Sequence, residues 1–325
     1  MPRVKAKFTF AIPFTIRMLG EDVCQPFALE VGENRVVVYP PARWNEENRA
    51  YCWTEDPERP IGSVDDIPVW LADEVLIDVE REVESNTITQ EDADNFLKTA
   101  SDLLVRLLQT CRWRTQQTWI RADILPTSYN VRYFDEAGNW IRGGVADRAG
   151  AVVTKAIFGL PHLNSTMWDT ICQDIASGAV PELWEELLLD AKEALLNQPR
   201  RAIIDTGAAC EVFVELFCNK LANALGVDKD VYTELTPQRR PFPEYFHVVM
   251  RYLVKHSLKD EHPDIYKEIT HLYKTASSVR HEGRCQYKKD DKKGTIVKVD
   301  APRASSMIKA ARSAIEWAKS LWNES

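Results

Sequence analysis

The residues best suited to chemistry lie together near the C-terminus, in the segment Leu272–Gly283, where a predicted helix runs into a histidine and stops at a glycine. His281 suits proton transfer because the pKa of imidazole lies near neutrality. Lys274 and Ser277 lie seven and four residues before it, and Arg284 lies three residues after it. If the helix continues that far, these side chains share its face. The spacing therefore predicts a candidate catalytic histidine with polar and basic neighbours.

The same helix opens a basic segment of the chain. Residues 274–312 contain eleven Lys or Arg and four acidic residues, a net charge of +7 in a protein whose overall charge is −8. Such a segment can follow a nucleic-acid backbone, whereas a lysine-rich loop without a ligand is simply solvated. Arg280 stands about 100° from His281 around the helix and is expected to point elsewhere. The candidate nucleic-acid-binding residues are Arg280, Arg284, Lys288, Lys289, Lys292 and Lys293.

A second basic and aromatic group lies in the N-terminal half of the chain. Arg112-Trp113-Arg114 is followed by Trp119 and Arg121. Interleaved basic and aromatic residues can hold phosphates and stack bases. Tryptophans in a predicted strand region more often belong to the core, and that is the interpretation we favour here.

Several kinds of site are not indicated by the sequence. It contains no Gly-rich phosphate loop, no His-Glu-x-x-His and no nucleophile elbow, so we expect no cofactor. The seven cysteines include no Cys-x-x-Cys, which argues against a metal site and favours a reducing cytoplasm. The apolar run Phe8–Ile16 is short, contains Pro13 and meets Arg17, so it predicts a strand rather than a signal peptide. No segment is apolar enough for a membrane span.

Residues 1–160 are predicted to form an α+β domain. Lys5–Arg17 predicts a strand, and Phe27–Tyr39 predicts a hairpin with its turn at Gly32-Glu33-Asn34. Thr89 and Asp92 have the spacing of a capping box in front of a helix with one apolar face. Residues 42–66 are polar and predict a loop. Further extended segments are expected at Val69–Glu80, Trp119–Leu125, Tyr129–Phe134 and from Trp140.

Residues 161–325 are predicted to form an all-α helical bundle. A short helix begins after Asn164 and ends at Gly178, and Pro302 begins the last helix. A polar, lysine-rich loop is expected over residues 284–300. The helices between are expected from Pro181 to Pro199 and over Arg201–Leu225, Phe242–Leu258 and Asp264–His281.

Four segments carry a resemblance to a known family. They are Leu187–Ala191, Arg200–Asp205 continuing through Ala208–Val212, Leu272–Gly283, and Ala314–Trp317. Their order and separations resemble those of the HEPN superfamily, in the group called Apea-like. The resemblance covers about 180–325 and implies a HEPN-like helical bundle.

The resemblance also implies an activity. Active HEPN ribonucleases dimerise and cleave RNA without metal at a composite site, using an arginine four to six residues before a histidine. In this chain the histidine is His281, but Ala276 stands where the arginine usually stands, and Ser277 replaces the common asparagine. Alanine cannot bind a phosphate. Lys274, Ser277 and Arg284 are the candidates to substitute for the arginine.

The same spacing occurs twice more in the sequence. Arg251 precedes His256, and Arg240 precedes His247, at separations that satisfy the motif. Neither pair precedes a helix that stops at glycine, and Arg240 is followed by a proline, so we interpret both as coincidental. If Asp264–His281 is not the key helix, Arg251 and His256 are the next candidates.

These features lead to three functional hypotheses. The first is a cytoplasmic, dimeric HEPN-like protein that binds RNA or a nucleotide, or acts as a divergent effector in defence or stress. The second is a metal-independent endoribonuclease that uses His281. The third is an oligomerisation scaffold without a nucleic-acid ligand. In each case residues 1–160 are expected to sense a signal or bind a protein partner.

Overall fold

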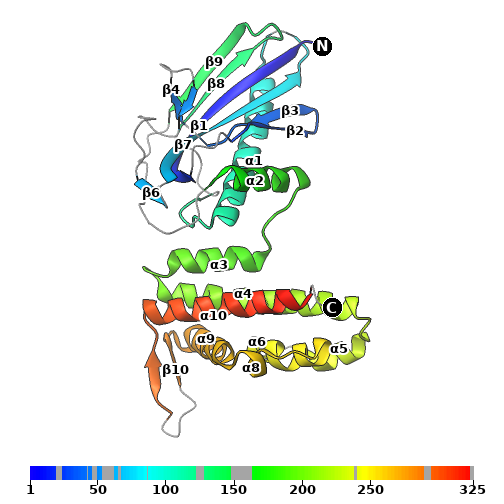
Figure 1. Ribbon diagram of the computed structural model, residues 1–325. Helices are drawn as coiled ribbons and strands as arrows, with labels where there is room; N and C mark the ends of the chain where they lie inside the picture. Colours follow the sequence, from blue (N-terminus) through cyan, green and yellow to red (C-terminus); the bar gives the residue numbers. More distant parts are fainter. Residues whose placement is uncertain are drawn as a thin grey trace. The chain divides into compact units, whose positions relative to one another are not determined.

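The computed structural model describes residues 1–19, 24–41, 43–45, 50–52, 62–64, 67–85, 87–121, 128–147, 163–237, 240–288 and 294–322 (Figure 1). The chain divides into two compact units, Met1–Val180 and Pro181–Ser325. The first contains an antiparallel sheet with two helices, and the second is mainly helical. The expected order of an α+β unit and a helical unit is thus confirmed. Within the described residues, no helix combines the length and apolar composition needed to cross a membrane.

The first unit is built on a sheet that has seven strands among the described residues. Their order is β2-β3-β7-β1-β8-β9, and β6 pairs with β7. The central strand β1 alternates between buried and more exposed residues from Val4 to Phe14, because successive side chains of a strand point to opposite faces, and the residues from Phe14 to Met18 are all buried. The strands are β1 (Arg3–Leu19), β2 (Phe27–Val31), β3 (Asn34–Val38), β6 (Gly62–Val64), β7 (Ile67–Glu82), β8 (Ser128–Phe134) and β9 (Trp140–Asp147).

A proline interrupts β1 without ending it. The register between β1 and β7 shifts between Ala11 and Ile16, and Pro13 lies inside this stretch. Proline has no backbone N–H to donate to the ladder, so an irregularity is expected there. The prediction of a strand over Lys5–Arg17 is confirmed, and the strand extends two residues further at each end.

Two helices pack on the sheet in this unit. α1 (Gln90–Thr115) begins at the predicted capping box, in which Asp92 N donates to Thr89 Oγ1 at 3.1 Å and Thr89 N donates to Asp92 Oδ2 at 3.1 Å. Its predicted apolar face is buried. The buried residues of that face are Phe96, Ala100, Leu103, Leu104, Leu107 and Cys111.

The second helix, α2 (Ser165–Ser177), belongs to the first unit and not to the helical bundle. Its apolar residues, including Trp168 and Ile171, lie in the same core as the sheet. The Trp168 indole donates to the carbonyl of Gln25 at 2.8 Å, and Leu163 N donates to the carbonyl of Arg17 at 2.8 Å. The boundary between the units therefore lies at 180/181, rather than at the expected 160/161.

The segment 42–66 differs from the expected loop. It contains two short paired strands, β4 (Arg43–Asn45) and β5 (Ala50–Cys52), as well as β6. The polar composition of the segment gave no alternating pattern from which such strands are predicted. The predicted extension over Trp119–Leu125 is wrong for residues 119–121, which form a turn and irregular chain, and its remainder lies outside the described residues.

The second unit is a bundle whose central helix α4 contacts α3, α9 and α10. Figure 1 shows α3, α4 and α10 running side by side. Its core is formed by apolar side chains of α4, α9 and α10, with the chain around α6 closing one side. The helices are α3 (Leu183–Ala194), α4 (Pro199–Ala224), α5 (Lys229–Leu235), α6 (Phe242–Glu244), the π-helix η1 (Tyr245–Val249), α7 (Met250–Val254), α8 (Leu258–Glu261), α9 (Pro263–Glu282) and α10 (Ala301–Trp322).

Two expectations for this unit need correction. The single helix expected over Phe242–Leu258 is divided into α6, the π-turn η1 and α7, and it ends where Lys255 adopts a left-handed conformation at φ 67°. The loop expected over residues 284–300 contains a hairpin of β10 (Gln286–Lys288) and β11 (Ile296–Lys298). Each strand is only three residues long, too short to show an alternating pattern, and the residues that join them include three of the predicted lysines.

Candidate functional site

A pocket with a volume of about 530 Å³ opens in the second unit, between α4, α9 and the chain that leads into α6 and η1. We name it the His281 pocket. From α9 it is lined by Tyr273, Ala276, Ser277, Arg280 and His281. These positions recur at helical spacing and form one face of α9. The pocket therefore contains the candidate histidine.

The end of α9 decides which of the predicted neighbours share this face. The helix stops at Glu282, and Gly283 caps it at φ +66° with its N–H donating to the carbonyl of Val279 at 3.1 Å. Arg284 therefore lies beyond the helix and does not line the pocket. Lys274 is on α9 but does not line the pocket either. Of the three candidate substitutes for the motif arginine, only Ser277 lies in the pocket.

Arg280 lies in the pocket with His281, contrary to the expectation that it points elsewhere. Its Nη1 donates to Glu211 Oε1 at 2.9 Å and its Nη2 donates to Glu211 Oε2 at 3.1 Å, across to α4. The long arginine side chain crosses from its own position on α9 to the neighbouring helix. Glu211 therefore forms a two-point ion pair with Arg280, which gives this carboxylate a partner.

Ala276, at the position of the missing arginine, is closely packed. Its side chain is 2% exposed and lies against Gly207 of α4. A Cβ added at Gly207 would lie only 3.0 Å from the Ala276 Cβ, which is a tight contact for two such atoms. The helices α4 and α9 can approach this closely because both residues are small. The position of the motif arginine is therefore part of the close contact between α4 and α9.

A second arginine of the pocket is Arg240, which was interpreted from the sequence as a coincidental match with His247 and not expected beside His281. It immediately precedes the Pro241 that leads into α6, and its side chain is 17% exposed. Its Nη1 donates to Glu244 Oε2 at 3.2 Å. Tyr245, the first residue of η1, lies in the same pocket, and burial, together with the nearby Glu215 carboxylate, raises the pKa of its phenol. Tyr245 therefore keeps its proton and can donate a hydrogen bond.

His281 itself is exposed in the last turn of α9. The ring makes no hydrogen bond or ion pair with any residue in the described part of the chain. A histidine at a helix C-terminus interacts favourably with the helix dipole when protonated. Of the predicted lysines, Lys288 is exposed on β10, and Lys289, Lys292 and Lys293 lie outside the described residues.

The alternative arginine–histidine pair makes contacts of its own. Arg251 forms an ion pair with Asp260, and His256 Nδ1 lies 2.7 Å from Glu261 Oε1. Glu261 also accepts a hydrogen bond from the Trp317 indole at 2.9 Å, which joins α8 to α10. Neither Arg251 nor His256 lines the His281 pocket. These contacts give the pair a structural role.

The hairpin β10–β11 is attached to the bundle through Arg303 of α10. Its Nη2 donates to Glu268 Oε1 at 2.8 Å and to the Tyr287 hydroxyl at 3.1 Å. The His271 ring stacks on Tyr287 with 4.3 Å between ring centroids, and its Nδ1 lies 3.1 Å from the same guanidinium nitrogen. Burial lowers the pKa of His271, with Arg303 acting in the same direction and Glu268 opposing it. The network holds the base of the lysine-rich hairpin against α9.

The basic and aromatic group of the first unit has structural contacts. Arg114 Nε and Nη2 donate to the two carboxylate oxygens of Asp174 at 2.5 and 2.8 Å, which joins α1 to α2. The Trp119 indole is 6% exposed and donates to the carbonyl of Thr15 at 2.8 Å. The favoured core interpretation therefore fits the observed contacts.

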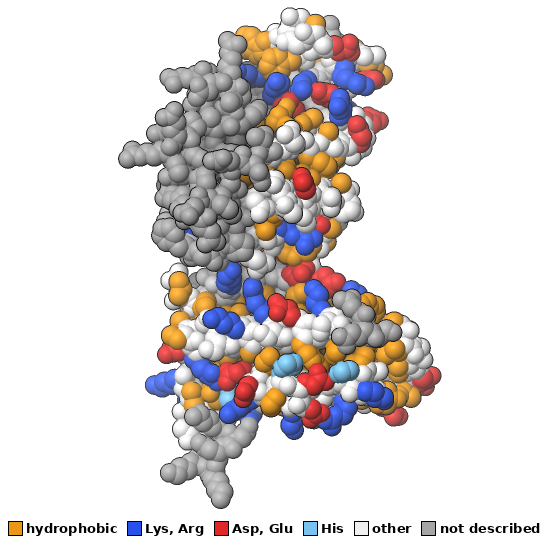
Figure 2. Space-filling view, in the orientation of Figure 1, with side chains coloured by type: hydrophobic (Ala, Val, Ile, Leu, Met, Phe, Trp, Pro, Cys, Tyr) orange, Lys and Arg blue, Asp and Glu red, His pale blue; other side chains and the backbone are white. Residues whose placement is uncertain are grey.

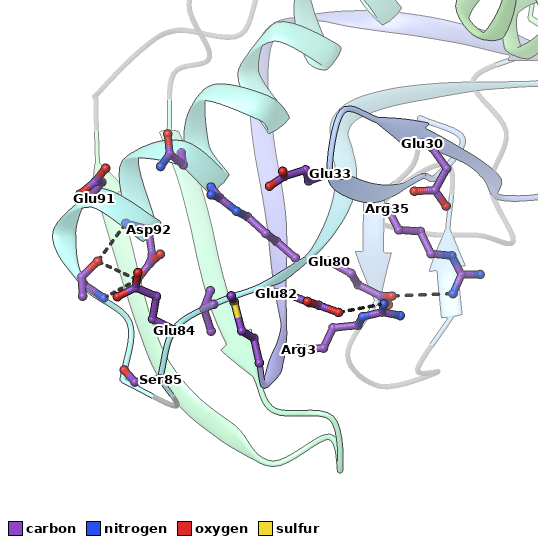
Figure 3. Close-up of a pocket in the computed structure, with 15 residues that line it drawn as sticks. Arg3, Glu30, Glu33, Arg35, Glu80, Glu82, Glu84, Ser85, Glu91 and Asp92 are labelled. Atoms are coloured by element: carbon purple, nitrogen blue, oxygen red, sulfur yellow. Dashed lines mark hydrogen bonds and ion pairs between the residues drawn. The ribbon is translucent and has the colours of Figure 1, made fainter.

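A larger cavity of about 840 Å³ lies in the first unit, beside the edge of the sheet (Figure 3). We name it the acidic pocket, because seven carboxylates and three arginines line it. Figure 3 shows Arg3 beside Glu82 and Arg35 beside Glu80, with nitrogen-to-oxygen distances of 3.8 and 3.7 Å. Two of its three arginines thus form ion pairs within the cavity.

Charges of both signs are interspersed over the helical unit on the face shown in Figure 2. The basic excess of residues 274–312 therefore does not form a separate uniform patch on this face. Among the described residues, no three His, Cys, Asp or Glu side chains are grouped in a way that could hold a metal ion.

Comparisons of this chain with protein-family models, with curated proteins and with solved structures gave no match.

Proposed function

We propose that the C-terminal unit is a HEPN-like bundle that binds RNA, or another nucleotide-containing ligand, in the His281 pocket. The observation that carries the proposal is the convergence of His281, Ser277 and two arginines, Arg240 and Arg280, on one pocket. Guanidinium groups match phosphate oxygens in charge and geometry. Tyr273 adds an aromatic side chain of the kind on which bases stack.

The packing of Ala276 favours binding without cleavage. In the family that the chain resembles, the motif arginine comes from this position of the same helix as the histidine. Here a buried alanine lies against Gly207 of α4, and a longer side chain at this position must displace neighbouring atoms. A divergent effector or binding protein therefore fits the pocket better than an enzyme with the family's usual motif.

A second candidate function, metal-independent endoribonuclease, is supported by the presence of Arg240 in the same pocket as His281. In such a reaction the RNA 2′-hydroxyl attacks the adjacent phosphorus, and the bond to the 5′-oxygen breaks. The products are a 2′,3′-cyclic phosphate and a 5′-hydroxyl end. His281 would move the proton, and an arginine would stabilise the charge on the phosphate.

The proposed protein is a dimer, and its first unit has a separate role. A dimer formed through the helical bundle follows from the family resemblance, and Leu216 and Tyr252 are apolar side chains exposed on α4 and α7, 43% and 47% respectively. We assign the first unit a sensing or partner-binding role. The cysteine pattern supports a cytoplasmic protein. An assembly without a nucleic-acid ligand, the scaffold hypothesis, is an outcome of the test below.

The test is a titration of fluorescently labelled single-stranded RNA with the full chain, in excess EDTA, at several salt concentrations. Binding that weakens as salt rises, with intact RNA on a denaturing gel, supports the proposal. Cleavage by the wild-type protein that is lost in His281→Ala supports the endoribonuclease instead. Absence of binding by folded protein, together with a dimer in light scattering, supports the scaffold.

A further inference from the structure

Arg240 is the pocket residue that the sequence motif does not explain. It comes from the chain before α6, whereas the motif histidine lies on α9. We propose that Arg240 is the phosphate-binding arginine of the His281 pocket and replaces the arginine that is missing at position 276. The inference rests on the proposed function, because it assigns a ligand contact within the same site.

The two arginines of the pocket differ in how their donors are used. Arg280 directs both terminal nitrogens to the two oxygens of Glu211, at 2.9 and 3.1 Å, so its charge is matched by a carboxylate in a two-point contact. Arg240 uses Nη1 for Glu244, whereas its buried Nε makes no hydrogen bond with any described residue. A buried donor without a partner is costly, and an anion in the pocket would provide one.

The surroundings of Arg240 also suit a phosphate. Tyr245 and Ser277 line the same pocket and carry hydroxyl groups, and the Tyr245 phenol keeps its proton. Hydroxyl and guanidinium donors together can satisfy several phosphate oxygens. Since Arg240 is more buried than Arg280, with side chains 17% and 36% exposed, its charge is less screened by water.

The size and the aromatic wall of the pocket define the class of ligand. A volume of about 530 Å³ lies in the range of small-molecule sites. Tyr273 is half-buried on its wall and meets Phe242 edge to face, with 5.6 Å between ring centroids. This combination fits one nucleotide unit, with the phosphate on Arg240 and the base beside Tyr273. The unit can be a free nucleoside monophosphate or part of a single strand.

The experiment compares Arg240→Gln with Arg280→Gln, a matched control that removes the same charge from the same pocket. Both are titrated against labelled single-stranded RNA and against adenosine 5′-monophosphate. Arg240→Gln is expected to weaken RNA binding about tenfold or more, Arg240→Lys to weaken it less, and Arg280→Gln to change it less than about threefold. An equal or larger loss in Arg280→Gln overturns the assignment.

The outcomes separate this inference from the proposed function. If the wild type binds RNA and Arg240→Gln binds it equally well, Arg240 is not the ligand but the RNA site stands. If the wild type binds only the monophosphate and Arg240→Gln loses it, the inference stands and RNA is the wrong ligand. If the folded wild type binds neither, both fail.

A second variant covers the case in which Arg240→Gln does not fold. Glu244→Gln removes the carboxylate that contacts Arg240 and leaves the arginine in place. It is expected to tighten binding of both ligands, because Arg240 no longer has a competing anion. Unchanged or weaker binding by folded Glu244→Gln contradicts the assignment.

Discussion

Two cavities in the described part of the chain, the acidic pocket and the His281 pocket, differ in the balance of their charges. The acidic pocket of the first unit has seven carboxylates against three arginines, and Arg3 and Arg35 are paired within it (Figure 3). The His281 pocket has two carboxylates, two arginines and a histidine, with aromatic side chains beside them. A polyanion is repelled from the first and can be accommodated in the second. Size alone therefore does not locate the proposed nucleotide site, because the larger of these two cavities has the wrong charge for a phosphate.

The two pockets also differ in the elements that form them. The acidic pocket is formed at a strand edge by side chains of several strands and the start of α1. The His281 pocket depends on one close approach of helices, where Gly207 meets Ala276. Changes at that crossing should therefore affect the fold more than any single change of charge.

The largest effect is expected from restoring the motif arginine. Ala276→Arg places a long charged side chain at a buried helix contact, so the free energy of unfolding is expected to fall by about 3 kcal/mol or more. Urea unfolding measures the loss. RNA cleavage in the variant is not expected, because an arginine side chain beside the close contact of Ala276 with Gly207 displaces the pocket residues around it.

Two variants serve as controls for that change. Ser277→Arg puts the same side chain one position further on, where the residue is half-buried and lines the pocket, and should cost about 1 kcal/mol or less. Gly207→Ala adds one methyl at the crossing and should cost about 1 kcal/mol. If Ala276→Arg and Ser277→Arg have the same free energy of unfolding, the contact between α4 and α9 has room for a long side chain. An arginine at the motif position would then fit the fold.

The next effect concerns the lysine-rich hairpin. Changing Lys288, Lys289, Lys292 and Lys293 together to glutamine should weaken RNA binding about tenfold or more. The slope of log K against log salt should also fall by about 0.7 for each lysine that contacts a phosphate of a single strand. The titration is the one used for the wild type, repeated at each salt concentration.

A control in the first unit distinguishes a local contact from a change in net charge. Lys7, Arg35, Arg81 and Lys98 lie in that unit, and changing all four to glutamine removes the same charge as the hairpin variant. RNA affinity should then stay within about threefold of the wild-type value at moderate salt. An equal loss in both variants would show that overall charge, and not the hairpin, governs binding.

A smaller effect is expected from acid. The pKa of His271 is lowered in the folded protein, chiefly by burial, while the unfolded chain keeps a value of about 6.5. The unfolded state therefore binds more protons as the pH falls below 7, and stability decreases toward pH 5. His271→Gln should flatten part of this decrease in urea unfolding. His247, whose pKa is also lowered, remains in both proteins.

The smallest effect on stability is expected at the Arg280–Glu211 pair. Its side chains are 36% and 41% exposed, so Glu211→Gln should change the free energy of unfolding by less than about 1 kcal/mol. The same variant leaves Arg280 free and should tighten RNA binding slightly. A large loss of stability would mean that the pair holds α4 to α9, rather than limiting the charge of the pocket.

Many elements of the fold were predictable because short sequence patterns determine where they begin and end. The alternation along β1, the Thr89–Asp92 capping box and the glycine caps at Gly178 and Gly283 each have a short-range signature. The hairpin β10–β11 has none, because its six strand residues include lysines and exposed positions. The sequence over Phe242–Leu258 predicts one continuous helix and gives no sign of the π-helix η1 within it.

The site was predictable in part. His281 and Ser277 were identified from the spacing on one helix, and both line the pocket. Arg240 was interpreted only as a coincidental match with His247, because it lies on another element and only tertiary packing brings it to the pocket of His281. The direction of Arg280 was misjudged because a helical projection places the Cα, whereas a long side chain can cross to Glu211.

The most direct test of the account is to incubate single-stranded RNA with wild-type protein and with His281→Ala, both in excess EDTA, and to measure binding by anisotropy and RNA integrity on a gel. The account predicts salt-sensitive binding by the wild type, weaker binding by the variant and intact RNA with both. Absence of binding by folded wild type, or cleavage that disappears with His281, would contradict it.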